Sequence, residues 1–141
     1  MSNKELESQV INYTQGALWD YNIVTKTLSD VLLDSRVHES DFYLPLYTDF
    51  MNHKNIVRQW SDDFTTIAMD VTLAYTNKRI SATTILKFNA MSSAFSWLYL
   101  AFESLNRIYS YEDNDQKRLE YQTFSTHFER SFSAMENYPI D

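Results

Sequence analysis

The sequence predicts an all-α protein: four long antiparallel helices in an up-down-up-down bundle, with the third helix the most buried. Three observations predict it. Apolar residues recur every three or four positions over long stretches, which is the spacing of one helical face. No alternating run of apolar and polar residues bounded by turn residues is long enough for a convincing strand. The connections between the stretches are short enough for antiparallel neighbours. Because 141 residues is the size of one domain, we expect residues 1–141 to form a single helical-bundle domain.

The first expected helix starts near Leu6 and carries one apolar stripe. Ser2 and Glu5 have the spacing of a capping box at its start. Gly16 lies inside it, at a cost of about 1 kcal/mol relative to Ala. The pattern fails after Asp34, which predicts a connection over residues 35–44. The stripe consists of Leu6, Val10, Tyr13, Ala17, Tyr21, Val24, Leu28 and Val31.

The second expected helix, from Phe50 to Ala74, shows the clearest periodicity in the chain. Its apolar positions alternate by three and four with one polar member, His53. A histidine there could be a buried ligand or a pH switch, but a core or boundary histidine is the more frequent case. The stripe consists of Phe50, His53, Val57, Trp60, Phe64, Ile67, Val71 and Ala74.

The third expected helix, residues 83–110, has two apolar stripes, so we expect neighbours on two sides and the most central place in the bundle. Ser81 or Thr83 can cap it, and Asp113 or Asn114 can cap a fourth helix that ends before Pro139. One stripe of the third helix is Ile85, Phe88, Phe95, Tyr99, Phe102 and Tyr109, and the other is Met91, Ala94, Leu98, Ala101, Leu105 and Ile108. The inward residues expected of the fourth helix are Tyr121, Phe124, Phe128, Phe132 and Met135.

Composition argues against several classes of function. Twelve Lys and Arg against nineteen Asp and Glu give a net charge of −7, which repels nucleic-acid phosphates and anionic lipid headgroups. One Gly in 141 residues argues against phosphate-binding loops, and the lack of Cys excludes a thiolate nucleophile or ligand. His38, His53 and His127 share no helical turn, so no metal site is expected, and no cofactor.

The acidic residues of the second helix do not change this interpretation. Asp62, Asp63 and Asp70 lack the facing acidic partners with which helical enzymes hold magnesium, so a solvated helix face is the favoured interpretation. No nucleophile motif is present either, and we expect no enzyme activity. The amino terminus has no apolar signal-like stretch and the longest charge-free run, residues 88–102, is too short to span a membrane, so a cytoplasmic location is expected.

The candidate binding residues lie around Pro45, where large apolar side chains stand beside acids. Such a segment either folds over the end of the bundle or presents aromatic side chains to a partner or a second subunit. With its acids it would suit a basic partner protein. The candidate residues are Phe42, Tyr43, Leu44, Leu46, Tyr47, Glu39, Asp41 and Asp49.

Three hypotheses of function follow. The first is a non-catalytic protein–protein interaction protein, a small acidic helical adaptor or inhibitor. In composition the chain is similar to accessory proteins of phages and mobile elements, which would make a host protein the target. The second is a self-associating structural or assembly component, and a homodimer is expected from the apolar surface that four helices leave uncovered. The third is an acidic nucleic-acid mimic that blocks a nucleic-acid-binding protein.

Overall fold

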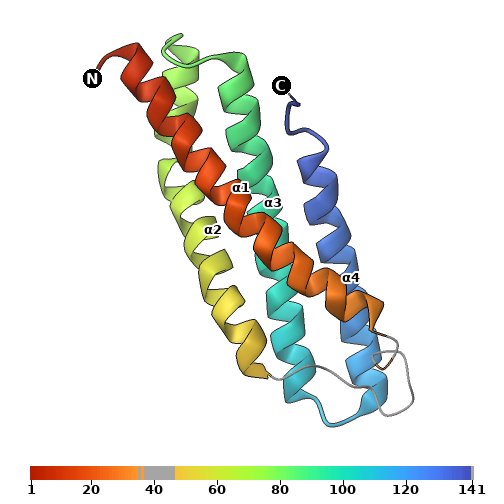
Figure 1. Ribbon diagram of the computed structural model, residues 1–141. Coiled ribbons are helices and arrows are strands. Elements are labelled where there is room, and N and C mark those ends of the chain that lie inside the picture. Colours follow the sequence, from red (N-terminus) through yellow and green to blue (C-terminus); the bar gives the residue numbers. More distant parts are fainter. Residues whose placement is uncertain (35, 37–46, 141) are drawn as a thin grey trace.

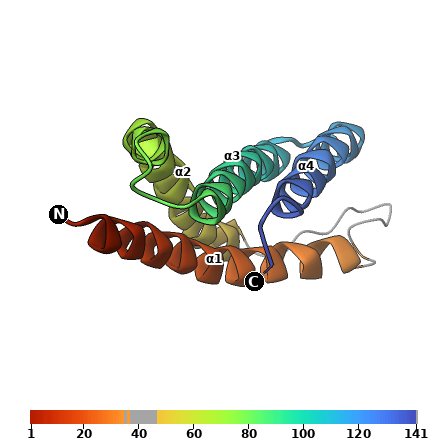
Figure 2. The ribbon, with the colours of Figure 1, turned by 90° about the horizontal axis from the view of Figure 1, so that it is seen from above.

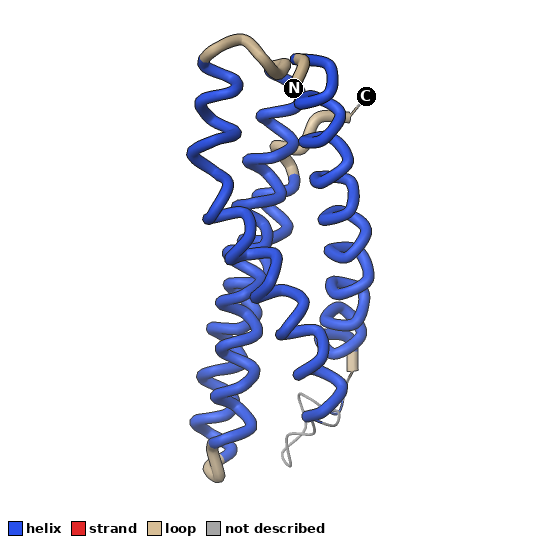
Figure 3. The backbone as a smooth tube through the Cα atoms, turned by 90° about the vertical axis from the view of Figure 1, so that its left-hand side faces the viewer, coloured by secondary structure: helices blue, strands red, loops and turns tan. Residues whose placement is uncertain are grey.

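The computed structural model describes residues 1–34, 36 and 47–140. Four long helices connect in up-down-up-down order, and the described residues contain no strand, which confirms the predicted fold class (Figures 1 and 3). The helices are α1 (Asn3–Leu33), α2 (Tyr47–Thr76), α3 (Ala82–Ser110) and α4 (Asn114–Met135).

Local capping explains where three of the helices begin. The Ser2 hydroxyl accepts a hydrogen bond from the Glu5 amide at 3.1 Å, as a capping box requires. Ser81, not Thr83, caps α3 by accepting from the Thr84 amide, and Asp113 caps α4. Each cap satisfies an amide that has no partner within its helix. Ser2 was predicted as a cap, and Ser81 and Asp113 were each one of two candidates, with Thr83 and Asn114 as the others.

α2 ends in a turn that its sequence does not favour. The Arg79 amide bonds to the Ala74 carbonyl at 2.8 Å and the Lys78 amide to the Tyr75 carbonyl at 2.9 Å, the pair of bonds that closes a Schellman motif. The motif needs a left-handed residue, and Lys78 supplies it with φ 61°. Glycine is the usual residue at this position. The turn between α2 and α3 therefore places backbone strain on Lys78.

The four helices are not arranged as a square bundle. α2, α3 and α4 lie side by side, and α1 runs obliquely across one face of that layer (Figure 2). Its amino-terminal end lies over α2, and its carboxyl-terminal end lies over α4 (Figure 1). α3 therefore has α2 and α4 on its flanks and α1 across its face, which is why it needs two apolar stripes.

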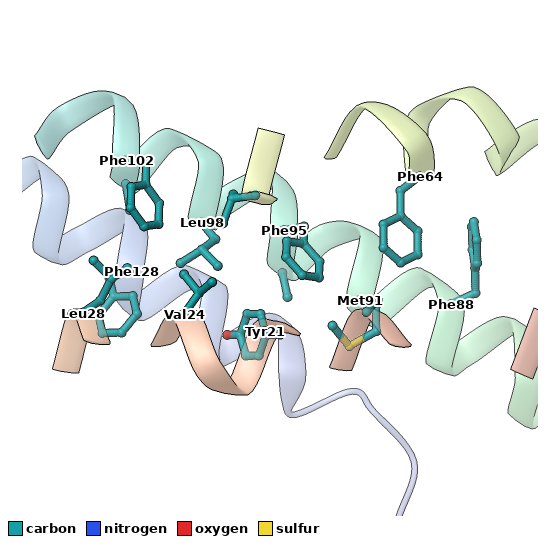
Figure 4. Close-up of a cluster of buried hydrophobic side chains, with 14 of the residues drawn as sticks. Tyr21, Val24, Leu28, Phe64, Phe88, Met91, Phe95, Leu98, Phe102 and Phe128 are labelled. Carbon is teal, nitrogen blue, oxygen red and sulfur yellow. The ribbon is translucent and has the colours of Figure 1, made fainter. Parts of the chain in front are cut away.

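The core follows α3 through the middle of the molecule. Tyr21, Val24 and Leu28 of α1 point toward α3, and Phe64 of α2 and Phe128 of α4 join them in the core (Figure 4). The predicted stripes of α3 are buried apart from two half-buried tyrosines, Tyr99 and Tyr109. The prediction that the third helix is the most buried is confirmed.

One residue predicted to point inward does not. Phe132 of α4 is 44 % exposed. One part of its ring packs on Phe128, with ring centroids 4.7 Å apart, and on Tyr21 at 6.4 Å. Because α4 is an edge helix and α1 only crosses it, the rest of the Phe132 ring faces solvent.

A buried polar contact joins three helices. The Ser131 side chain of α4 is fully buried, donates a hydrogen bond to the Ala94 carbonyl of α3 at 2.7 Å and lies 3.0 Å from the Tyr21 hydroxyl of α1. Burial raises the pKa of Tyr21 to about 12, against the opposing effect of the Ser131 hydrogen bond. The phenol therefore stays neutral and holds α1 against the α3–α4 pair.

None of the described helices is apolar over enough of its length to cross a membrane.

Candidate functional site

The segment around Pro45 lies mostly outside the described residues. Tyr47 and Asp49 belong to the first turn of α2, and Phe42, Tyr43, Leu44, Leu46, Glu39 and Asp41 are not among the described residues. No side chain of these eight residues is described, so their role in partner binding stays a prediction. The next apolar residue, Phe50, is 3 % exposed and packs near Tyr109.

His53 is a half-buried boundary residue between α1 and α2. Its Nε2 lies 3.5 Å from the Thr27 hydroxyl of α1, and its buried Nδ1 has no partner among the described residues. In the part of the chain that is described, no group of three or more histidine or acidic side chains is placed to hold a metal ion.

An open groove lies between the amino-terminal half of α1 and the carboxyl-terminal half of α2. It consists of two adjoining cavities of about 310 Å³ and 420 Å³ that share Leu6, Val10, Asp70 and Val71. We call it the α1–α2 groove. Its other lining residues are Gln9, Tyr13, Ile67, Leu73, Ala74, Asn77, Arg79 and Phe88.

Two polar contacts close the ends of the groove. At one end, the Arg79 guanidinium donates to the Asn3 side chain and to the Met1 carbonyl, both at 3.0 Å. At the other end, the Trp60 indole nitrogen of α2 donates to the Asp20 carboxylate of α1 at 2.7 Å. Between these contacts no hydrogen bond joins the described residues of the two helices, and the groove lies open.

A further polar contact fixes the start of α1 to the start of α3. The Glu7 carboxylate accepts hydrogen bonds from the Thr84 hydroxyl at 2.5 Å, the Ser81 hydroxyl at 2.8 Å and the Ser81 amide at 2.9 Å. Burial alone would raise the pKa of Glu7, but these bonds outweigh it and lower the pKa. The ionised carboxylate therefore holds the α1 wall of the groove at a fixed distance from α3.

Aromatic rings support the deep end of the groove. The Tyr13 ring packs edge-on against Trp60 and Phe64, with both centroid distances 5.1 Å. Its buried hydroxyl has no hydrogen-bond partner among the described residues. Burial and the nearby charge of Asp63 raise the pKa of Tyr13 to about 12, so the phenol is neutral and can donate or accept a bond. A buried hydroxyl without a partner costs free energy.

The charge around the groove has one sign along both walls. Residues 5–25 contain the acids Glu5, Glu7 and Asp20 and no Lys or Arg, and residues 59–77 contain Asp62, Asp63 and Asp70 and no Lys or Arg. The basic residues Lys4, Lys78 and Arg79 stand at the end that the Arg79 contacts close. Asp70 and Arg79 are the charged residues of the groove lining, so the middle of the groove is apolar with Asp70 at its border.

Comparison with protein-family models, with curated proteins and with solved structures finds no match to this chain. The site must therefore be interpreted from its own chemistry. That chemistry is an apolar floor, a neutral phenol without a partner, and carboxylates along the rim.

Sequence reasoning assigned most of this groove to the core. Leu6, Val10 and Tyr13 belong to the first predicted stripe, and Ile67 and Val71 to the second. Those stripes do face each other, but the two helices diverge, so the residues line a groove. The one feature of the sequence that could have pointed to this groove is that residues 5–25 and 59–77 contain acids and no Lys or Arg. That pattern indicates a negatively charged surface on this part of the molecule.

A second exposed feature lies on the outer face of α1. Trp19 is 72 % exposed and Ile23 is 48 % exposed. Residues four apart on a helix are neighbours, so the two side chains form one apolar patch.

Proposed function

We propose that the protein acts without catalysis, as a protein–protein interaction module, and that the α1–α2 groove holds a segment of its partner. The observation that carries the proposal is an open groove with an apolar floor and the Asp70 carboxylate in its lining. Concave apolar sites with a few placed polar groups are the usual form of binding sites. An adaptor or inhibitor of a host protein is the role that this surface supports best.

Leu73 offers a test that leaves the core untouched. Its side chain lines the groove and is 51 % exposed, so Leu73→Lys adds a charge to the groove without burying it. Met69→Lys is the matched control, because Met69 lies one turn earlier on α2, is 75 % exposed and is not part of the groove lining. Circular dichroism and thermal unfolding should show both variants folded like the parent protein.

The readout is affinity capture with tagged protein from a lysate of the source organism. We expect a captured protein that the parent and Met69→Lys retain and that Leu73→Lys loses. Capture that is equal with all three proteins would place the interaction elsewhere. If none of the three captures a protein, the proposal of an interaction module is wrong.

Self-association is the second candidate function, and the patch of Trp19 and Ile23 favours it. An exposed Trp on an otherwise polar helix face is typical of an interface residue. Analytical ultracentrifugation should then show a dimer in the parent protein and a monomer in Trp19→Ala. A parent protein that stays monomeric at high concentration would exclude this candidate.

A further inference from the structure

The walls of the α1–α2 groove restrict the shape of its occupant. Both walls are α-helices whose backbone groups bond within the helix, so they offer no strand edge to which an extended peptide could add. From Leu6 to Tyr13 the α1 wall spans about 10 Å, or two helical turns. That length suits two or three apolar side chains from one face of a helix, which is the helix-in-groove mode of recognition.

The rim of the groove restricts the charge of the occupant. The Asp70 carboxylate lies in the groove lining, and no described residue donates a hydrogen bond or an ion pair to it. Asp63 stands two turns earlier on the same face of α2. Among the described residues it accepts a hydrogen bond only from the side-chain amide of Gln59, at 3.0 Å. Two carboxylates seven residues apart are matched by two basic side chains seven residues apart on a helix that runs along α2.

A second copy of this chain does not meet that requirement. Each copy carries a net charge of −7, and both walls of the groove are acidic over residues 5–25 and 59–77. Bringing two such surfaces together opposes like charges, which costs affinity and slows association. The charge of this surface therefore favours a basic partner protein over a second copy of the chain.

We propose that the α1–α2 groove binds a basic amphipathic helix of another protein, with apolar side chains on the floor formed by Val10, Val71 and Phe88 and with Lys or Arg side chains on Asp63 and Asp70. This inference rests on the proposed function and adds the class of partner to it.

The probe is a fluorescent amphipathic peptide of about 18 residues, long enough to form a helix on binding. It carries Leu at positions spaced by three and four and two Lys seven residues apart that flank the Leu face. A second peptide replaces both Lys by Glu, and a third keeps the Lys and replaces the Leu by Ser. Fluorescence anisotropy of each peptide is measured against the folded full chain, at low and at high salt.

We expect the Lys peptide to bind at least about tenfold more tightly than the Glu peptide, with the difference reduced by salt. The Ser peptide should not bind, because burial of the Leu side chains drives the association. Asp70→Asn should weaken the Lys peptide about two- to fivefold, as for one partly exposed ion pair. Asp62→Asn is the matched control: it removes the same charge from the same helix at an exposed position off the face that Asp63 and Asp70 share, and should have no such effect.

Three results would overturn the basic helix as partner. They are equal binding of the Lys and Glu peptides, equal effects of Asp62→Asn and Asp70→Asn, and binding of neither peptide. The capture experiment separates this failure from failure of the proposed function. If a captured protein is lost with Leu73→Lys but retained with Asp70→Asn and with Asp70→Lys, the groove is a binding site and its partner is not basic.

Discussion

At the scale of single residues, Gly16 is a helical glycine that nothing in its surroundings requires. It is exposed, and a Cβ added there would lie 3.7 Å from Cη2 of Trp60, an ordinary van der Waals contact. Gly16→Ala should therefore raise the free energy of unfolding by about 1 kcal/mol, since alanine loses less backbone entropy in a helix. Urea unfolding followed by circular dichroism measures it. A less stable variant would mean that α1 needs a glycine at this point.

Lys78 presents the opposite case, a side chain where glycine belongs. Its φ of 61° is left-handed, and such a conformation costs a non-glycine residue about 1 kcal/mol. Lys78→Gly should raise the free energy of unfolding by about that amount. The same substitution at Lys117, inside α4, should lower it by a similar amount, because there the backbone is helical. Equal effects at both positions would contradict the strain assigned to Lys78.

At this scale the starts of three helices could be predicted from the sequence. The candidate caps included Ser2, Ser81 and Asp113, because a cap bonds to an amide only two or three residues away. The left-handed Lys78 was not predicted, since most residues other than glycine avoid that conformation. The exposure of Phe132 was missed because it depends on how much of α4 is covered by α1.

At the scale of helices, Trp60 holds α1 and α2 together. Its half-buried ring stacks on Phe95 at 5.9 Å, and its indole donates to Asp20. Trp60→Ala should lower the free energy of unfolding by about 3 kcal/mol, the lower end of the range for large-to-small core substitutions, because the ring is half-buried. Met69→Ala is the matched control and should change it by less than about 0.5 kcal/mol, since Met69 is an exposed residue of the same helix. A loss below about 1 kcal/mol in Trp60→Ala would mean that α1 and α2 do not depend on this contact.

The contact of α1 with the α3–α4 pair depends on Ser131. Replacing it by Ala removes the donor to the Ala94 carbonyl and leaves the buried Tyr21 hydroxyl without a partner. The expected loss is about 1–3 kcal/mol in the free energy of unfolding. Ser131→Ala combined with Tyr21→Phe should lose less than Ser131→Ala alone, because no orphaned hydroxyl remains. A double variant that loses the sum of both single effects would show that the two hydroxyls do not interact.

At the scale of the whole molecule, two groups should make the fold less stable in acid. The pKa of Glu7 is lowered from 4.5, so its contribution is fully present above pH 4.5 and is lost as the pH falls through the folded-state pKa. The pKa of His127 is lowered from 6.5 by burial and by the charges of Arg130 and Arg107, against the opposing charge of Glu120. The unfolded chain therefore takes up a proton at His127 first, and stability falls as the pH drops below 6.5.

Thermal unfolding between pH 2 and pH 8 tests both contributions. His127→Gln should flatten the curve just below pH 6.5, and Glu7→Gln should flatten it below pH 4.5. Glu7→Gln should also be less stable than the parent at neutral pH, because the ionised acceptor of three hydrogen bonds is lost. A parent protein with the same stability over the whole range would contradict both assignments.

The sequence by itself determined four helices, their caps, their order and the central place of α3. Helix formation and capping depend on residues three or four positions apart, so a periodic stripe such as that from Phe50 to Ala74 is sufficient evidence. Only the tertiary structure decided the oblique course of α1 and the groove that it leaves beside α2. Apolar stripes specify which faces meet, but the crossing angle depends on how all the side chains at the contact pack together. Leu6, Val10 and Tyr13 could therefore have closed on α2 as core, and they form the wall of an open site because α1 crosses the α2–α3–α4 layer at an angle.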